Sequence, residues 1–310
     1  MKRGKIQNRL EELQVRPSKQ RGQNFLSNPE ILRGIVRFGA ARAGERLVEI
    51  GGGLGALTGH LAPLGNLTVI ELEPQFCAEL KRLFPDITVV EADARTFPFE
   101  SLGANLVVYG NVPYVYSTEI LFNLIRSATQ IDRVILLLQR EFVERMAAKP
   151  GGKTYGILSV MVQLWADVEM GSIIGGGSFH PPTKVESRLV LLRFHRTPRY
   201  QVKNYELLRS VVRAAFSQRR RMITNSLRSL GYGTPGQIRT ALERSGIPIT
   251  DRAERVPIEK FVRLAEEVAT FAPALTESSN PFPTAPISEI DSFDEAEGKV
   301  REEKIDETNR

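Results

Sequence analysis

The tetrapeptide Asn111-Val112-Pro113-Tyr114 has the residue types needed to hold a flat, weakly nucleophilic amine such as N6 of adenine. It follows an apolar run, Asn105 to Gly110, that is typical of a buried strand, and open α/β sheets bind ligands at the carboxyl ends of strands. The Asn111 side-chain oxygen and the Val112 carbonyl could accept two N–H bonds from the amine. Pro113 would fix the turn and Tyr114 would stack on the base. The alternative is that Asn111 caps the next helix and Tyr114 is a core residue.

A glycine-rich stretch follows an earlier predicted strand and forms a second candidate ligand contact. The stretch is Glu49-Ile50-Gly51-Gly52-Gly53-Leu54-Gly55, and glycines such as Gly51 and Gly53 let the backbone turn sharply and approach a ligand closely. Further along, Glu71 ends the next predicted strand, where a carboxylate can accept hydrogen bonds from both hydroxyls of a ribose. The loop also fits the loose dinucleotide fingerprint, so it leaves S-adenosylmethionine and a dinucleotide as open alternatives.

Asp93 favours the first of these cofactors. It lies just beyond a third predicted strand, where its carboxylate could accept a hydrogen bond from the adenine amine of a nucleoside cofactor. A dehydrogenase would need an acid or base near the nicotinamide, and no histidine or lysine stands at a strand end to supply one. The alternative for Asp93 is a plain helix cap.

Alternating strand-like and helix-like segments predict the scaffold that positions these residues. Short apolar runs separated by helical segments indicate an α/β fold with a parallel, doubly wound sheet, and amphipathic helices beyond Pro198 indicate a small C-terminal helical domain. The predicted strands are Arg46–Ile50, Leu67–Glu71, Ile87–Glu91, Asn105–Gly110 and Arg133–Gln139, with Val168–Ile174 and Arg188–His195 pairing antiparallel at the edge; the predicted C-terminal helices are Tyr205–Phe216, Arg219–Leu230, one starting at Thr234-Pro235, and Pro257–Ala269.

The charge distribution divides the chain further. The net charge is +6, but residues 273–310 hold ten acidic and four basic side chains, which leaves +12 for residues 1–272. A body this basic favours a polyanionic partner such as nucleic acid. We therefore predict a basic N-terminal arm at 1–22 that contacts RNA, a catalytic domain at 23–197, an RNA-binding helical domain at 198–272 and a disordered acidic tail at 273–310.

Several function classes are excluded. The sequence has no apolar stretch long enough to span a membrane and no signal-like segment near its start, so we expect a cytoplasmic protein without a membrane partner. The single cysteine, Cys77, cannot form an internal disulfide and is expected to be a small buried residue in a helix. His60, His180 and His195 are widely spaced, so no metal site is predicted.

Together the glycine loop, Glu71, Asp93 and the Asn-x-Pro-Tyr turn resemble the S-adenosylmethionine-dependent N6-adenine methyltransferases, whose fold is Rossmann-like. Three further segments narrow the resemblance to the KsgA-type (RsmA) family of small-subunit (16S) ribosomal RNA adenine N6,N6-dimethyltransferases. They are Gln23-Asn24-Phe25-Leu26, Phe179-His180-Pro181-Pro182-Thr183-Lys184-Val185-Glu186-Ser187 and Ala215-Phe216-Ser217-Gln218-Arg219-Arg220-Arg221. Two departures are mild: Gly52 replaces the family's usual proline, and Val112 its usual leucine.

The resemblance implies roles for individual residues. The cofactor would contact Asn24, Leu26, Gly51, Gly53, Glu71, Asp93 and Asn111. Phe179 would stack on the target adenine opposite Tyr114; the alternative is an aromatic ring packed beside a loop. Basic residues in the helical domain would contact RNA phosphates, against the alternative of a solvated basic face; these are Arg213, Arg219, Arg220, Arg221 and Arg228.

The predicted function is therefore dimethylation, from S-adenosylmethionine, of two adjacent adenosines near the 3′ end of 16S rRNA in the assembling small ribosomal subunit. We expect the enzyme to be a monomer, because its large RNA substrate can supply the binding surface that a second subunit would otherwise provide. One rival is the macrolide-resistance type of large-subunit rRNA adenine methyltransferase, which shares the Asn-x-Pro-Tyr turn. Another is a ribosome-assembly factor on the same fold that makes little use of the cofactor. The segment from Phe216 to Arg221 argues against the first rival, and intact Glu71, Asp93, Asn111 and Tyr114 argue against the second.

Overall fold

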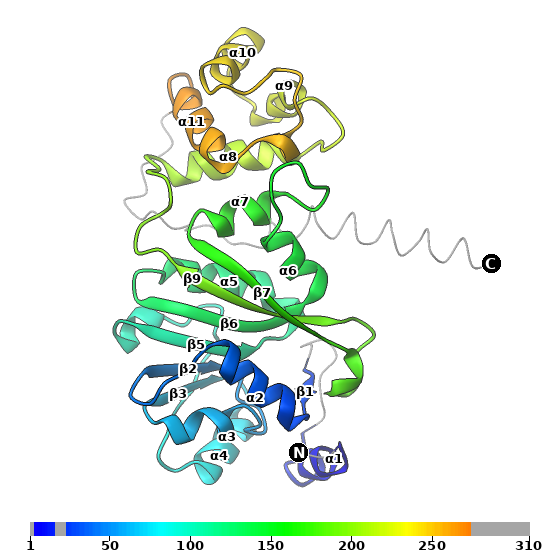
Figure 1. The fold of residues 1–310 in the computed structure, drawn as a ribbon. Coiled ribbons are helices and arrows are strands. Elements are labelled where there is room, and N and C mark those ends of the chain that lie inside the picture. The colour runs from blue at the N-terminus through cyan, green and yellow to red at the C-terminus, as the bar shows by residue number, and fades with distance from the viewer. Residues whose placement is uncertain (1–2, 16–22, 274–310) are drawn as a thin grey trace, which may run out of the picture. The chain divides into compact units, whose positions relative to one another are not determined.

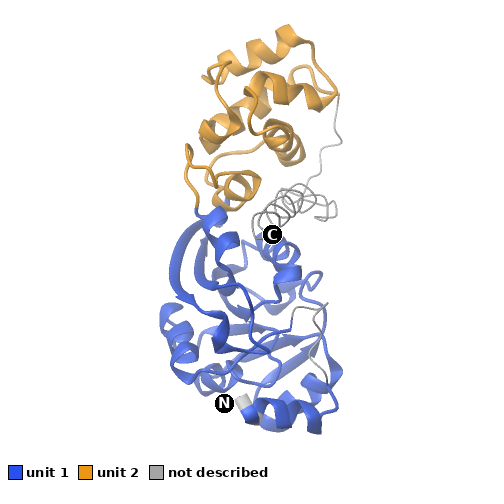
Figure 2. Cartoon of the chain, turned by 90° about the vertical axis from the view of Figure 1, so that its right-hand side faces the viewer, with its two compact units in different colours: residues 1–147, 165–197 blue, residues 148–164, 198–310 orange. Residues whose placement is uncertain are grey.

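The computed structural model describes residues 3–15 and 23–273 of the chain. The chain divides into two compact units: unit 1 comprises residues 1–147 and 165–197, and unit 2 comprises residues 148–164 and 198–310 (Figure 2). The predicted acidic tail, residues 273–310, lies outside the described residues from 274 onward.

Unit 1 is built on a seven-stranded sheet of order β4-β3-β2-β5-β6-β9-β7 (Figure 1). The strands from β2 to β6 run parallel, and β9 joins β6 and β7 antiparallel. Their bounds are β2 Arg46–Ile50, β3 Leu67–Glu71, β4 Thr88–Glu91, β5 Leu106–Asn111, β6 Ile131–Gln139, β7 Ala166–Ile174 and β9 Ser187–Phe194. Sequence reasoning placed each of these strands to within two residues and predicted the antiparallel edge, so the α/β, Rossmann-like prediction is confirmed. The chain leaves β2 toward β3 and β4 and later returns to β5, so the strand order reverses beside β2, where such sheets bind ligands.

The helices of unit 1 are α1 Arg3–Glu12, α2 Pro29–Phe38, α3 Thr58–Leu61, α4 Pro74–Leu83, α5 Ser117–Arg126 and α6 Arg140–Met146. A two-stranded sheet pairs β1, Phe25–Leu26, antiparallel with β8, Phe179–His180. Helix α2 begins where it does because Asn28 accepts a hydrogen bond from the Glu30 amide at 2.9 Å and Pro29 occupies the first helical position. Its buried face, Leu32 and Ile35, packs on the apolar side chains of the sheet.

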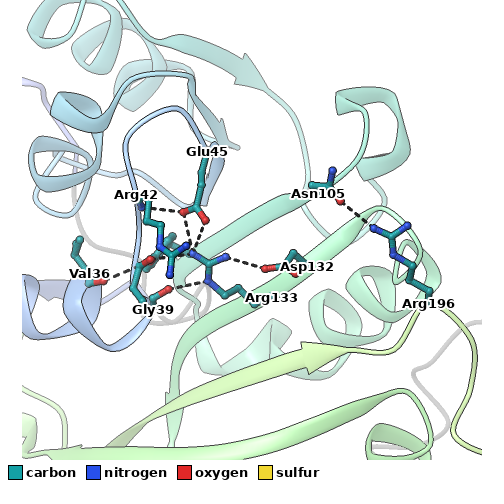
Figure 3. Close-up of polar contacts among 10 residues, drawn as sticks. Val36, Gly39, Arg42, Glu45, Asn105, Asp132, Arg133 and Arg196 are labelled. Carbon is teal, nitrogen blue, oxygen red and sulfur yellow. Dashed lines mark hydrogen bonds and ion pairs between the residues drawn. The ribbon is translucent and has the colours of Figure 1, made fainter.

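Arg133, near the start of β6, ties the amino-terminal edge of the sheet together (Figure 3). Its side chain is only 9 % exposed, and it donates to the carbonyl oxygens of Gly39 at 2.8 Å and Ala40 at 3.1 Å. It also forms ion pairs at 2.8 Å with Glu45, which precedes β2, and with Asp132. A buried guanidinium is tolerated because each of its nitrogens has a partner, and the cluster joins the end of α2 to β2 and β6.

The predicted basic N-terminal arm, residues 1–22, contains a packed helix, α1. Residues 3–12 form a helix whose Ile6 and Leu10 are buried against Leu54 and Phe76 of the same unit. Apolar residues spaced four apart give the segment one face that can be removed from water, a pattern that its basic composition concealed. Residues 16–22, which carry further basic side chains of the predicted arm, lie outside the described residues.

Unit 2 contains α7 Ile157–Gln163, α8 Tyr205–Phe216, α9 Ile223–Ser226, α10 Pro235–Arg244 and α11 Ile258–Ala269. The predicted cap at Thr234 is present as a capping box with Gln237. The sequence assigned residues 148–164 to the catalytic domain, whereas the structure groups them with unit 2. The reason is contact: the Tyr155 hydroxyl donates to the Val256 carbonyl at 3.0 Å, and the Arg219 guanidinium donates to the Tyr155 carbonyl at 2.7 Å.

Candidate functional site

A cavity of about 150 Å³ lies at the carboxyl ends of β2, β3 and β5, wholly within unit 1. It brings together every cofactor residue that the sequence predicted and the whole Asn-x-Pro-Tyr turn. The predicted residues that line it are Asn24, Leu26, Gly51, Gly53, Glu71, Asp93, Asn111, Val112, Pro113 and Tyr114. Segments far apart in sequence meet here because parallel strands present their carboxyl ends at one edge.

The glycine loop turns away from β2 with left-handed backbone at Gly51, φ 73°, and Gly53, φ 51°. A side chain at either position would strain the backbone, which explains these two glycines. Gly52 is required for a different reason: a Cβ there would lie 2.6 Å from Cγ1 of Val69 and 2.8 Å from Cδ1 of Leu80. The core side chains occupy the space that a larger residue at 52 would need, so this departure from the family's proline is matched by the packing around it.

Glu71 is held rigidly at the end of β3. One carboxylate oxygen accepts from the Gly53 amide at 2.9 Å, and the other accepts from the amides of Leu72 at 2.8 Å and Glu73 at 3.0 Å. The side chain is buried, and burial raises its pKa while the backbone hydrogen bonds oppose that shift. A carboxylate oriented by fixed donors can accept hydrogen bonds from the hydroxyl groups of a ligand without reorganisation.

Glu49 is a pocket residue that opens the glycine-rich stretch and to which the sequence analysis gave no role of its own. It lies within the apolar strand β2, is 2 % exposed, and accepts a hydrogen bond from the Thr58 hydroxyl at 2.6 Å. Burial raises the pKa of its carboxyl group to about 7. A charged residue type inside an otherwise apolar strand was the signal that could have identified it.

Asp93 is engaged by a neighbour that the sequence analysis also missed. The Arg95 guanidinium donates to both carboxylate oxygens of Asp93 at 2.6 to 3.0 Å, and its central carbon lies 4.4 Å from the centroid of the Tyr116 ring. These hydrogen bonds lower the pKa of Asp93. Asp93 is not a helix cap, because no helix starts after it; it forms a turn in which it accepts from the Arg95 amide at 2.9 Å.

Asn111 is fixed by the segment that precedes the main sheet. Its side-chain nitrogen donates to the Asn24 carbonyl at 2.8 Å. Because a carbonyl can only accept, this bond fixes which end of the amide is which and leaves Oδ1 as the acceptor end. The helix-cap alternative for Asn111 is wrong, since α5 begins after Tyr116.

The two predicted aromatic residues differ in their surroundings. Tyr114 lines the pocket, and its hydroxyl is 2.5 Å from the Ser187 hydroxyl. Phe179 is fully buried and packs in the core with Leu26 and Ile174, because β8 pairs with β1 and places Phe179 opposite Leu26. The structure therefore brings Tyr114 to the pocket and leaves the Phe179 ring among the core side chains.

The five predicted RNA-contacting arginines lie in unit 2 with unequal exposure. Arg220, Arg221 and Arg228 are exposed. Arg219 is half-buried and donates to the carbonyl oxygens of Lys153 at 2.8 Å and Tyr155 at 2.7 Å, so it holds a loop of its own unit. Arg213 is also half-buried. Residues 219–221 form a turn after α8 rather than the start of the predicted helix, which begins only at Ile223.

Three further predictions concern features outside the pocket. Cys77 is buried in α4, as expected, and burial raises the pKa of its thiol to about 11. Within residues 3–15 and 23–273, no group of His, Cys, Asp and Glu side chains could hold a metal ion. Over the same ranges no helix combines the length and apolar character needed to cross a bilayer.

Comparison with known proteins assigns this chain to a family. Residues 15–270 match the family model described as ribosomal RNA adenine dimethylase. The "ribosomal RNA small subunit methyltransferase A" of Pseudomonas putida is 40 % identical over 266 residues, which cover 84 % of this chain and 97 % of that protein. The protein of the same name from Geobacter sulfurreducens is 38 % identical over 262 residues, covering 81 % and 95 %.

Solved structures agree with this assignment. A dimethyladenosine transferase from Plasmodium falciparum matches with a TM-score of 0.68 and 25 % identity, covering 79 % of this chain and 98 % of that one. The 23S rRNA methyltransferase ErmE matches with a TM-score of 0.61 and 25 % identity, covering 79 % and 100 %. The chain belongs to the ribosomal RNA adenine dimethylase family, and it is an rRNA adenine dimethyltransferase.

Proposed function

We propose that the protein transfers methyl groups from S-adenosylmethionine to N6 of two adjacent adenosines near the 3′ end of 16S rRNA, in the assembling small ribosomal subunit. The observation that carries the proposal is the pocket, which gathers an oriented carboxylate at Glu71, the glycine loop and the acceptor oxygen of Asn111. The choice of the small subunit is supported by the names of the similar proteins from Pseudomonas putida and Geobacter sulfurreducens. We place the enzyme in the cytoplasm as a monomer that binds its RNA substrate directly.

The residues of the pocket fit this cofactor. Glu71 offers a buried carboxylate for the ribose hydroxyls, and the left-handed glycines remove side chains from the loop beside it. Asp93 offers an acceptor for the adenine amine, for which Arg95 must share the carboxylate. Asn24 and Leu26 close the pocket from the segment ahead of β2.

When bound, S-adenosylmethionine supplies an electrophilic methyl group on a sulfonium. The protein's own residues make the adenine amine a better nucleophile: the Asn111 oxygen and the Val112 carbonyl accept its two N–H bonds, so its lone pair is directed at the methyl carbon. As the N–C bond formed and the C–S bond of the sulfonium broke, positive charge would develop on the nitrogen; the two acceptor oxygens would stabilise it, and the amine would then lose one N–H proton. In the second transfer the monomethylated amine would have one N–H left, which one of the two oxygens would accept. Tyr114, held by Ser187, provides a face on which the base stacks. Phe179, the second predicted aromatic contact, is fully buried among core side chains and does not line the pocket.

The arginines of unit 2 are proposed to bind RNA phosphates. Arg220, Arg221 and Arg228 are exposed and suited to this role, whereas Arg219 and Arg213 act partly within their own unit. Replacing one exposed arginine by alanine should reduce the salt dependence of RNA binding by about one unit of slope. Filter binding at several salt concentrations measures that slope.

The deciding experiment is methyl transfer from labelled S-adenosylmethionine to small subunits from cells that lack this modification. Mature small subunits, large-subunit RNA and an Asn111→Ala enzyme serve as controls. We expect dimethyladenosine only in the unmodified small subunits, with the rate reduced about 10²- to 10³-fold in Asn111→Ala. Label on large-subunit RNA would favour the resistance-type rival, and subunit binding without transfer would favour an assembly factor.

A further inference from the structure

Helix α1 forms part of the wall of the proposed cofactor pocket. Ile6 lines the same cavity as Gly53, Glu71 and Asn111, although it lies far from them in sequence. The match to the family model begins only at residue 15, so α1 stands outside the segment by which the family is recognised. The pocket of this chain therefore includes an element that the motif residues do not supply.

The apolar contacts of α1 bear directly on the glycine loop. Ile6 is 1 % exposed and Leu10 is 3 % exposed, and both pack with Leu54, which follows Gly53, and with Phe76 of α4. Phe25 of β1 completes this cluster with an edge-to-face contact to Phe76, at 5.7 Å between ring centroids. Burial of two large aliphatic side chains is enough to hold a short helix in place.

An ion pair between α1 and α4 adds to these apolar contacts. Glu79 of α4 is 4 % exposed, and both of its carboxylate oxygens accept from the Arg9 guanidinium, with Nε at 2.7 Å from Oε1. Arg82 also donates to it at 2.9 Å, and the hydrogen bonds from Arg82 and Arg9 lower the pKa of Glu79 to about 2. A carboxylate this buried needs charge partners, and α1 supplies one of the two.

The position of α1 relative to Glu71 shows which part of the pocket it covers. Gly53, the residue before Leu54, donates its amide to Glu71, and Phe76 lies five residues beyond Glu71 on the helix that follows β3. Ile6 contacts this cluster and faces the same cavity. Helix α1 therefore covers the side of the pocket where Glu71 would hold the ribose.

We propose that α1 is a built-in wall of the S-adenosylmethionine site, in which Ile6 shields the ribose side from water and the Arg9–Glu79 ion pair holds the helix in place. This inference rests on the proposed function. Exclusion of water strengthens the hydrogen bonds that Glu71 makes. A ligand covered in this way leaves slowly, so the role of α1 is to slow release of the cofactor and its product, and Ile6 and Arg9 are positioning residues.

The test compares the full chain with Ile6→Ala, Arg9→Ala and a chain lacking residues 1–15. Gln7→Ala is the matched control, because Gln7 is an exposed residue of the same helix whose side chain donates to Glu11 at 3.1 Å. Dissociation of labelled S-adenosylmethionine and of S-adenosylhomocysteine is followed by displacement with excess unlabelled ligand. Thermal unfolding shows which variants remain folded, and single-turnover transfer at saturating cofactor reports the chemical step.

We expect the truncated chain to release both ligands about tenfold faster, with smaller increases for Ile6→Ala and Arg9→Ala and no change for Gln7→Ala. The single-turnover rate at saturating cofactor should be unchanged in the control Gln7→Ala, whose side chain is exposed and bonds to Glu11. If the truncated chain does not fold, the two point variants decide the matter.

Release rates unchanged in folded variants would overturn the proposal. Weaker RNA binding with unchanged release would also overturn it and would return α1 to the role of an RNA-contacting arm. Failure of the full chain to bind S-adenosylmethionine at all would instead remove the proposed function, and this inference with it.

Discussion

Polar side chains at the two ends of the central strands differ in how far the protein itself satisfies their hydrogen bonds. At the amino-terminal edge, the Arg133 guanidinium meets two carbonyl oxygens and two carboxylates of unit 1, so its hydrogen-bonding capacity is used within the fold. At the carboxyl edge, the Asn111 amide lines the pocket and is fixed at its nitrogen end by the Asn24 carbonyl, and we propose its oxygen end as an acceptor for the adenine amine. A polar cluster that satisfies itself holds a fold together, whereas one that is oriented but incompletely satisfied can bind a ligand.

The same contrast occurs along a single stretch of chain. Glu45, just before β2, accepts from Arg133 and from the Arg42 amide and lies at the amino-terminal edge (Figure 3). Glu49, within β2, is buried beside the pocket and accepts a hydrogen bond from the Thr58 hydroxyl rather than from a cation. Glu45 and Glu49 are therefore four positions apart in sequence, yet the first carboxylate stabilises the fold and burial of the second costs stability.

Breaking the amino-terminal cluster should have the largest effect on stability. Arg133→Ala would remove the donor to the Gly39 and Ala40 carbonyls and the ion-pair partner of Glu45. We expect the free energy of unfolding to fall by about 3–5 kcal/mol, with methyl transfer per folded molecule retained. Urea denaturation measures the first quantity. Arg196→Ala, which removes an exposed contact to Asn105, is the control; an equal loss in both variants would contradict the comparison.

Changing the carboxyl edge should affect binding rather than the fold. Glu71→Gln removes a charged acceptor from the proposed ribose contact, so the affinity for S-adenosylmethionine should fall about 10- to 100-fold. Isothermal titration calorimetry measures it. Glu91→Gln is the matched control, since Glu91 pairs with Glu71 in register on the neighbouring strand and is exposed. An affinity lowered equally by both changes would mean that Glu71 has no specific role.

The glycine loop joins the pocket to the core, so a substitution in this loop should change the free energy of unfolding. In Gly52→Ala the new methyl group would meet Val69 and Leu80, and we expect a loss of about 1–3 kcal/mol in the free energy of unfolding. Gly34→Ala lies within α2 in open space and should stabilise the protein by about 0.5–1 kcal/mol. Thermal unfolding of the two variants compares them, and a Gly52→Ala protein as stable as the parent would show that the core can move aside.

Glu45 and Glu49 should also differ in how they make stability depend on pH. Burial opposes ionisation of Glu45, but the Arg133 hydrogen bonds prevail and lower its pKa, so its contribution is present above about pH 4.5 and is lost as pH falls below it. The pKa of Glu49 is raised to about 7, so the folded state holds the extra proton and stability falls as pH rises from about 4.5 to 7.

Unfolding free energies across this range should separate the two carboxylates. Glu45→Gln should flatten the acid limb of the stability curve, and Glu49→Gln should remove the decline between the two pKa values. Profiles that change in the same direction for both variants would contradict the contrast drawn along β2.

Short sequence patterns predicted much of the fold and of the candidate site. Apolar runs predicted β2 and β3 with the bounds that the structure has, and Thr234 and Pro235 predicted the start of α10. Both predictions succeeded because strand burial and helix capping are properties of short segments. The pocket residues were also recognisable, since strand ends with glycine, carboxylate or amide side chains mark this edge of a parallel sheet.

Contacts between distant segments were beyond such patterns. Arg219 resembles its neighbours Arg220 and Arg221 in sequence, and only its bonds to the 153–155 loop show that it supports the fold. Phe179 is buried because β8 pairs with β1, which lies more than 150 residues earlier. Helix α1 was hidden by its charge, and its packing against Leu54 and Phe76 depends on where the glycine loop and α4 come to lie.

The sequence by itself determined which chemistry this protein can perform, because the acceptor groups and the glycines are fixed by residue type and by their places at strand ends. The tertiary structure decided which polar groups are already satisfied and which face a ligand. That division depends on distances between segments that the chain brings together only on folding, and hydrogen bonds and burial act over a few ångströms in space rather than along the sequence.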